Sequence, residues 1–184
     1  MIWESQYWKD DLLKKAAALR KRSTQKRWAE PSLARLEQSI MLGFYGIRKL
    51  HEAAKLSTAT MTQQVSVKAF PWLGKNVTKL NWHRLDELYD FASGAPQQQD
   101  LLFVCHQFVH SFIFTAAFDD DERLDAILFA SDRQRHKSLL SISIGQVISA
   151  FEQVGNDYPN SAQYILNAKT GDYDVDATML QNVS

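Results

Sequence analysis

The 184-residue sequence has few of the residues that cross-link or interrupt a chain: 1 cysteine, 4 prolines and 7 glycines. With Cys105 alone, a disulfide within the chain and a Cys-x-x-Cys zinc site are both excluded. Repeats, low-complexity segments and Pro/Gly/Ser linkers are also missing, so no change in composition marks a domain boundary. The sequence therefore predicts one domain over residues 1–184.

Long apolar runs are missing as well. No run approaches the roughly 20 apolar residues of a membrane helix, and the first residues lack the cationic and apolar segments of a signal peptide. We therefore expect a cytoplasmic protein that makes no contact with a membrane.

The chain has no net charge, because 21 basic side chains balance 21 acidic ones. The charges are nevertheless sorted along the sequence. Residues 1–30 hold eight basic and four acidic residues, a net charge of +4, and residues 117–184 hold five basic and eleven acidic residues, a net charge of −6. Such sorting steers an anionic partner to one end, or lets the two ends attract each other within one fold or across a dimer.

The amino-terminal half has mainly helical periodicity. Apolar residues recur at helical spacing over residues 3–28 and again over 31–56, and two long helices joined by a short break should form an antiparallel pair. A third helix is predicted to start near Asn81, and a fourth to run from about Gln98 to Ser111.

Strand patterns replace this periodicity in three places. Val65, Val67 and Ala69 alternate with polar residues, which predicts a short strand. Residues 112–118 and 124–130 flank an acidic turn and predict a hairpin, and residues 140–144 predict a further strand. A helix over 147–154 follows, and Asn160 or Ser161 is expected to cap another short helix that ends near Ala168.

The predicted fold class is α+β. An amino-terminal antiparallel helical hairpin and further helices are expected to pack with a small three- or four-stranded antiparallel sheet. Residues 1–113 should be mainly helical, residues 112–144 should form antiparallel strands, and residues 145–184 should form carboxy-terminal helices and an acidic tail.

Two histidines form the first candidate site. Within Cys105-His106-Gln107-Phe108-Val109-His110, the imidazoles of His106 and His110 lie one helical turn apart, and imidazole transfers protons or binds metals near neutral pH. The alternative is that one of them is a hydrogen-bonded core residue. Zinc proteases need a glutamate directly after the first histidine, where this chain has Gln107. We therefore expect no metal, and no other cofactor.

A basic turn forms the second candidate site. It consists of Arg133, Arg135, His136 and Lys137. Guanidinium groups bind phosphate through paired hydrogen bonds, so this turn is a candidate phosphate or RNA contact. The alternative is a solvated turn whose charges serve only solubility. Phosphate-loop, dinucleotide-binding and serine-hydrolase motifs are absent from the sequence.

The two long helices, followed by a helix that ends in x-His-x-x-x-His-Ser, resemble the HEPN superfamily over roughly residues 3–113. The resemblance implies a small prokaryotic protein that cleaves RNA as a toxin or belongs to a defence or toxin–antitoxin system. It places His110 at the catalytic histidine, with Cys105 where the signature arginine belongs and His106 at the polar position. Arg48, or Arg133 and Arg135, would have to supply the missing guanidinium.

We predict a non-enzymatic cytoplasmic interaction or regulatory protein, with a second copy or another protein as partner. The alternative is a metal-independent HEPN-like ribonuclease whose catalytic candidates are His110, His106 and Arg48, with RNA as partner. An enzyme requires His110 in a cleft near a guanidinium, whereas a scaffold requires it buried and hydrogen-bonded. Homodimerisation is predicted because several tryptophans fall near the amino terminus or in loops, namely Trp3, Trp8, Trp28 and Trp72.

Overall fold

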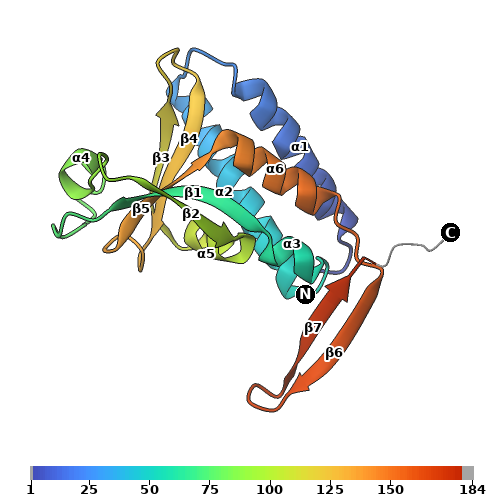
Figure 1. The fold of residues 1–184 in the computed structure, drawn as a ribbon. Helices are drawn as coiled ribbons and strands as arrows, with labels where there is room; N and C mark the ends of the chain where they lie inside the picture. The colour runs from blue at the N-terminus through green and yellow to red at the C-terminus, as the bar shows by residue number, and fades with distance from the viewer. Residues whose placement is uncertain (1, 180–184) are drawn as a thin grey trace.

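The computed structural model describes residues 2–179. Two long helices, α1 (Gln6–Arg22) and α2 (Glu30–Glu52), form the predicted antiparallel hairpin (Figure 1). Pro31 lies in the first turn of α2, where a backbone N–H would have no partner within the helix. Each helix buries one apolar stripe, which includes Leu12 and Leu19 in α1 and Ile40 and Phe44 in α2. The helical hairpin is therefore confirmed.

The main sheet is antiparallel and has five strands in the order β2-β1-β5-β4-β3. The strands are β1 (Gln64–Pro71), β2 (Ala95–Asp100), β3 (Ser111–Phe118), β4 (Leu124–Ser131) and β5 (Ser138–Ser143). The α+β class is confirmed, but the predicted three or four strands are too few. The additional strand is β2, which pairs with β1 from Gln64 opposite Asp100 to Ala69 opposite Ala95.

Strand β2 lies where the start of the fourth helix was predicted. Its sequence, Ala-Pro-Gln-Gln-Gln-Asp, has no apolar alternation, and most of its side chains are exposed. It forms a strand because it pairs with β1, which no local pattern reveals. Helix α5 (Leu101–Val109) follows directly, and the Asp100 side chain caps it by accepting a hydrogen bond from the Phe103 N–H at 2.5 Å.

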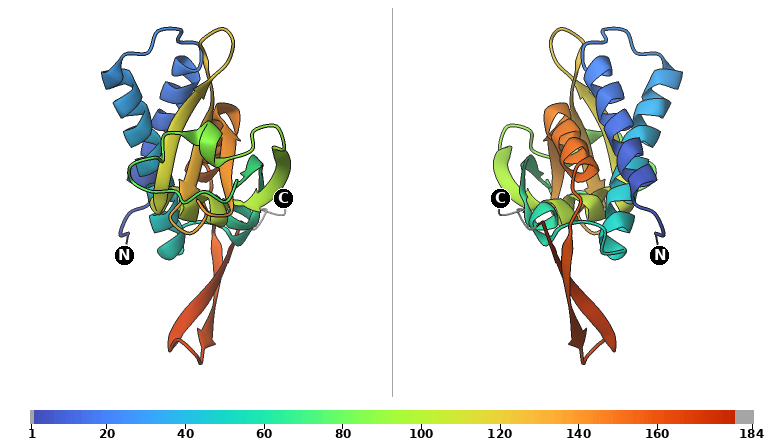
Figure 2. Two further views of the ribbon diagram at one scale, coloured as in Figure 1. Left: turned by 90° about the vertical axis from the view of Figure 1, so that its left-hand side faces the viewer. Right: turned by 90° about the vertical axis from the view of Figure 1, so that its right-hand side faces the viewer.

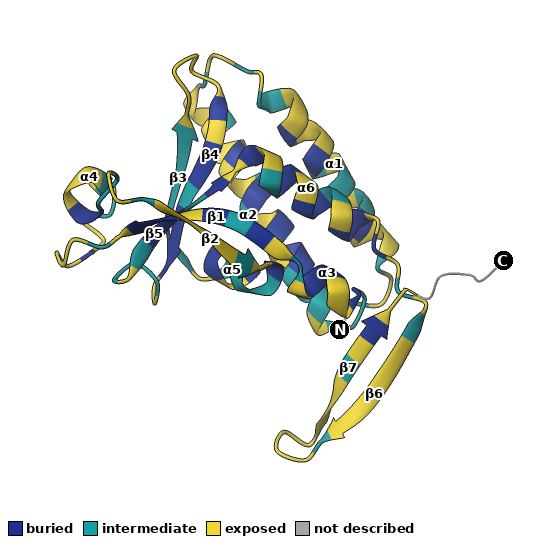
Figure 3. Ribbon diagram, in the orientation of Figure 1, coloured by how far each residue is buried: buried dark blue, intermediate teal, exposed yellow. Residues whose placement is uncertain are grey.

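Helices cover one face of the sheet, and a second, smaller core covers part of the other. Helices α1, α2, α5 and α6 (Ile144–Gly155) and the short α3 (Thr58–Thr62) contribute to a large core together with β1, β4 and β5 (Figures 1 and 3). The opposite face packs on the segment that contains α4 (Leu85–Leu88). The helix predicted from Asn81 is reduced to this one short turn, because Asn81 Oδ1 accepts from the Thr78 N–H instead of capping a helix.

The short helix predicted after Asn160 is wrong. Residues 161–178 form a hairpin of two strands, β6 (Ser161–Asn167) and β7 (Asp172–Thr178), which projects from the body of the molecule (Figures 1 and 2). Gly171 has a φ of +69° at the turn, a conformation that glycine adopts at no steric cost. Of the predicted carboxy-terminal helices only α6 is present, and residues 180–184 of the predicted acidic tail lie outside the described residues.

Over residues 2–179, no helix has both the length and the apolar character needed to cross a lipid bilayer.

A stack of three aromatic rings joins α2, α5 and β4. The rings of Phe44 and Phe108 are stacked with centroids 4.2 Å apart, and Phe108 stacks on Phe129 at 4.3 Å. All three side chains are buried. Phe129→Ala should lower the free energy of unfolding by about 3 kcal/mol or more, because it removes buried apolar surface and leaves a cavity. Urea denaturation measures this change.

The matched control is Phe118→Ala, since Phe118 is 41% exposed at the end of β3. It should cost clearly less than Phe129→Ala, because part of the Phe118 ring is already in water and its aromatic neighbour, Trp28, is itself only partly buried. Equal effects of the two substitutions would contradict the central place of the stack.

Candidate active site

Helix α5 and the turn after β4 hold the two candidate histidines. His106 is exposed on α5, and His110 is the residue that directly follows the helix. The His110 N–H donates to the His106 carbonyl, and the His110 carbonyl accepts from the Asp132 N–H, both at 3.1 Å. The backbone of His110 is therefore fixed by two elements, while its side chain is exposed.

A guanidinium lies next to His110. Arg48 Nη1, on α2, is 3.3 Å from His110 Nε2. Arginine has only donors, so Nε2 is the acceptor in this contact, and a neutral His110 ring carries its proton on Nδ1. Glu52 Oε1 holds the other side of the guanidinium at 2.8 Å from Arg48 Nε. Of the arginines that the sequence proposed, Arg48 is the one that reaches His110.

Arg48 and His110 line a cleft of about 500 Å³. Gln107 forms part of its floor, since its buried Oε1 accepts from the Ser131 N–H at 3.2 Å and so ties α5 to the end of β4. The lining residues come from α2, α5 and the turn after β4, namely Arg48, Phe103, His106, Gln107, His110, Ser131, Asp132 and Arg133. The cleft thus gathers two imidazoles and two guanidinium groups.

Of the four side chains of the predicted basic turn, one lines the cleft. The Arg135 guanidinium lies 3.8 Å above the Phe112 ring and pairs with Asp132 at 3.1 Å. His136 Nε2 accepts from the Val77 N–H at 3.2 Å. Both side chains are engaged in contacts within the fold on the α4 side of the sheet.

The exposed members of the turn are Arg133 and Lys137. Arg133 lines the cleft, and Lys137 does not. The structure therefore brings one of the four predicted phosphate-binding residues together with Arg48, His106 and His110.

The cleft disfavours additional positive charge. The pKa of His106 is lowered, first by the partial burial of its otherwise exposed ring and then by the charges of Arg48 and His110. Burial also lowers the pKa of the neighbouring His51. Hydrogen bonds from Lys49 and Arg48 lower the pKa of Glu52 to about 2. Glu52 is therefore an anion that fixes Arg48, and the imidazole of His106 favours its neutral, proton-accepting form.

Cys105, at the position of the missing signature arginine, takes no part in the site. Its side chain is buried in the core, and burial raises the pKa of the thiol. A protonated buried thiol is a poor nucleophile and a poor metal ligand.

Sequence reasoning missed Glu52, Gln107 and Asp132. The spacing of Arg48 and Glu52, four residues apart on one helix, is a signal for their ion pair. No sequence signal joins Gln107 or Asp132 to the site, because their contacts depend on how β4 packs against α5.

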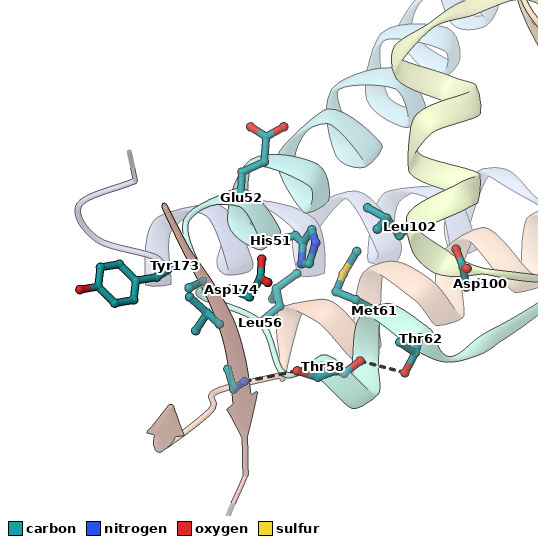
Figure 4. A pocket seen from close by; sticks show the side chains of 13 residues that line it. His51, Glu52, Leu56, Thr58, Met61, Thr62, Asp100, Leu102, Tyr173 and Asp174 are labelled. Atoms are coloured by element: carbon teal, nitrogen blue, oxygen red, sulfur yellow. Dashed lines mark hydrogen bonds between the residues drawn. The ribbon is translucent and has the colours of Figure 1, made fainter. Parts of the chain in front are cut away.

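A second cavity of about 370 Å³ lies between α2, α3 and β7. Figure 4 shows His51 and Glu52 on the side of α2, opposite Asp174 of β7. Residues 2–179 contain no group of three or more His, Cys, Asp or Glu side chains arranged to hold a metal ion. The Arg48 cleft, in contrast, places an imidazole and a guanidinium in direct contact.

No protein-family model matches this chain, and neither the curated proteins nor the solved structures include a significant match.

The charge environment of His106 is open to a direct test. Arg48→Met should raise the His106 pKa, because a nearby cation is removed, but leave it below its usual value of about 6.5, because burial remains the first cause. NMR titration of the 5 histidines measures this change. Arg84→Met, at an exposed arginine next to α4, should leave the His106 pKa unchanged.

The same lowered pKa has a consequence for stability. The folded chain binds the His106 proton less readily than the unfolded chain does. Its contribution therefore destabilises the fold as pH falls from about 6.5 through the lowered pKa, and disappears at higher pH. A His106 pKa above 6.5 in the folded protein would contradict this account.

Proposed function

We propose that this protein is a metal-independent ribonuclease that acts at the Arg48 cleft. The observation that supports it is the 3.3 Å contact between Arg48 Nη1 and His110 Nε2 at the wall of a cleft. The sequence alone favoured a non-enzymatic protein, because Cys105 stands where the HEPN arginine belongs. Arg48 offers a guanidinium from another helix, and this contact supports the enzymatic alternative.

The proposed reaction uses groups that the cleft already holds. The substrate phosphate lies between Arg48 and Arg133, which bind its non-bridging oxygens. His110 accepts the proton of the ribose 2′-hydroxyl while its oxygen forms a bond to phosphorus. The bond from phosphorus to the 5′-oxygen breaks, and His106, protonated before this step, gives its proton to that oxygen.

Each guanidinium has a defined role in this scheme. Arg48 leaves His110 Nε2 for the phosphate when the substrate binds, which frees the lone pair that accepts the proton. Both arginines stabilise the charge that develops on the phosphorane. The anionic phosphate between the imidazoles also favours the protonated form of His106, which the empty cleft disfavours.

The open shape of the site suits a polymer. His106, His110 and Arg133 are all exposed, so a strand can cross the cleft without being enclosed. RNA is the abundant cytoplasmic polymer that carries a 2′-hydroxyl beside each phosphodiester. The predicted cytoplasmic location therefore fits the proposed substrate. The HEPN ancestry and a role in defence or toxin–antitoxin systems stay predictions that this activity would fit.

A second candidate is an interaction module that binds RNA or protein at the same surface without cleaving it. One observation favours it: the lone pair of His110 Nε2 is occupied by the Arg48 guanidinium. If a bound phosphate does not draw Arg48 away, His110 has no free site for the hydroxyl proton. This is the non-enzymatic function that the sequence predicted first.

Cleavage of a single-stranded RNA separates the two candidates. We expect cleavage that persists in a metal chelator and varies with pH over the range in which imidazole titrates. His110→Ala should lower the rate by about 10² or more through loss of the proton acceptor. Arg48→Ala should lower it by a similar factor through loss of charge stabilisation. Gel analysis of a labelled RNA measures both.

His83→Ala is the matched control, because His83 is exposed on the segment next to α4. It should leave the rate unchanged. Purified protein that binds RNA but never cleaves it would contradict the ribonuclease and support the interaction module.

Arg133 and Lys137 provide a matched pair for binding. Arg133→Ala should weaken binding of single-stranded RNA about tenfold and reduce the salt dependence of binding by about one phosphate contact. Lys137→Ala should have a smaller effect, because Lys137 does not line the cleft. Fluorescence anisotropy at several salt concentrations measures both, and equal effects would show that the cleft is not the contact surface.

A further inference from the structure

The β6–β7 hairpin has one apolar and one acidic face. Residues opposite each other in the ladder point to the same side of a sheet. Tyr164 therefore shares a face with Val175, and Leu166 shares that face with Tyr173. On the other face Ile165 lies opposite Asp174, Gln163 opposite Asp176, and Asn167 opposite Asp172.

The body of the molecule buries only the base of the apolar face, and Tyr173 and Val175 further along β7 lie beside the cavity between α2, α3 and β7. Ala177 is buried at the base, and Thr58 of α3 fixes this base by donating to Asp176 at 2.6 Å and accepting from the Ala177 N–H at 3.3 Å. Further out, Tyr164 is 62% exposed, Leu166 60% and Tyr173 57%. Figures 1 and 2 show the hairpin extending beyond the rest of the fold.

The exposed apolar face of the hairpin is stabilised when a partner surface packs on it. An isolated two-stranded hairpin is marginally stable in water, and an exposed apolar face usually marks an interface. The acidic face needs no such partner surface, because its side chains stay hydrated or pair locally, as Asn167 does with Asp174 at 3.0 Å. The amphipathic pattern therefore specifies which side of the hairpin meets a partner.

We propose that the hairpin is a dimerisation arm whose apolar face packs on the same face of a second copy of this chain. A two-fold axis brings identical patches together, so one apolar face is self-complementary. When two arms cross face to face in opposite directions, the tip of each arm reaches the base of the other. At that end of the molecule lies the amino-terminal segment, with Trp3 96% and Tyr7 76% exposed (Figure 1).

The available area supports a second copy. With roughly 200 Å² for a fully exposed large side chain, Tyr164, Leu166 and Tyr173 offer about 350 Å² per chain. Trp3 and Tyr7 add a similar area, so two chains bury on the order of 1,400 Å². A stable, specific interface buries about 1,200–2,000 Å². The two patches together reach this range, and the arm alone does not.

Light scattering on the full chain tests the proposal. At high micromolar concentration we expect twice the chain mass of 21.1 kDa. Leu166→Asp should raise the dissociation constant about 100-fold or more, because it places a charge within the apolar face, opposite Tyr173. Ile165→Asp is the matched control: Ile165 is 56% exposed on the opposite face, and its replacement should leave the dimer intact.

A cross-linking experiment gives an independent readout in folded protein. Tyr164→Cys places a thiol in the middle of the apolar face, and the natural Cys105 is buried. A short bismaleimide should join two Tyr164→Cys chains, and it should not join two Ile165→Cys chains. A monomer at high concentration, or a dimer that survives Leu166→Asp, would overturn the proposal. Neither result depends on whether the cleft cleaves RNA.

Discussion

The stacked rings of Phe44, Phe108 and Phe129 are the interaction on which the rest of the structure depends. They fix α5 between α2 and the sheet in a single arrangement, since stacked aromatic rings in a dry core tolerate little displacement. Arg48 lies one helical turn after Phe44, and His110 lies two residues after Phe108. The stack therefore determines that the guanidinium and the imidazole meet.

Around this contact, charge and burial act together. Glu52 holds the guanidinium of Arg48 from one side, and the low pKa of its carboxyl keeps it anionic. Partial burial, and after it the charge of the same arginine, lower the pKa of His106. Glu52 and Arg48 thus hold a guanidinium beside His110, the proton acceptor of the proposed reaction, at a surface open to a large substrate.

Neighbours in the sequence have separate tasks in this fold. Arg135 and His136 anchor the turn after β4 to Phe112 and Val77, while Arg133 projects into the cleft. The acidic residues of β7 likewise belong to the polar face of the β6–β7 hairpin and not to a separate acidic tail. A run of like charges therefore gives no warning of how its members divide between structure and function.

The sequence by itself determined the helical hairpin, strands β1, β3, β4 and β5, and the position of the His106–His110 pair. Each of these depends on side-chain periodicity, which is a local property of the chain. The tertiary structure alone decided that Ala95–Asp100 forms a strand, that residues 161–178 form a hairpin, and which arginine reaches His110. Pairing along β1 and packing of α2 against α5 join residues far apart in the chain. Side-chain periodicity within one segment does not predict such contacts.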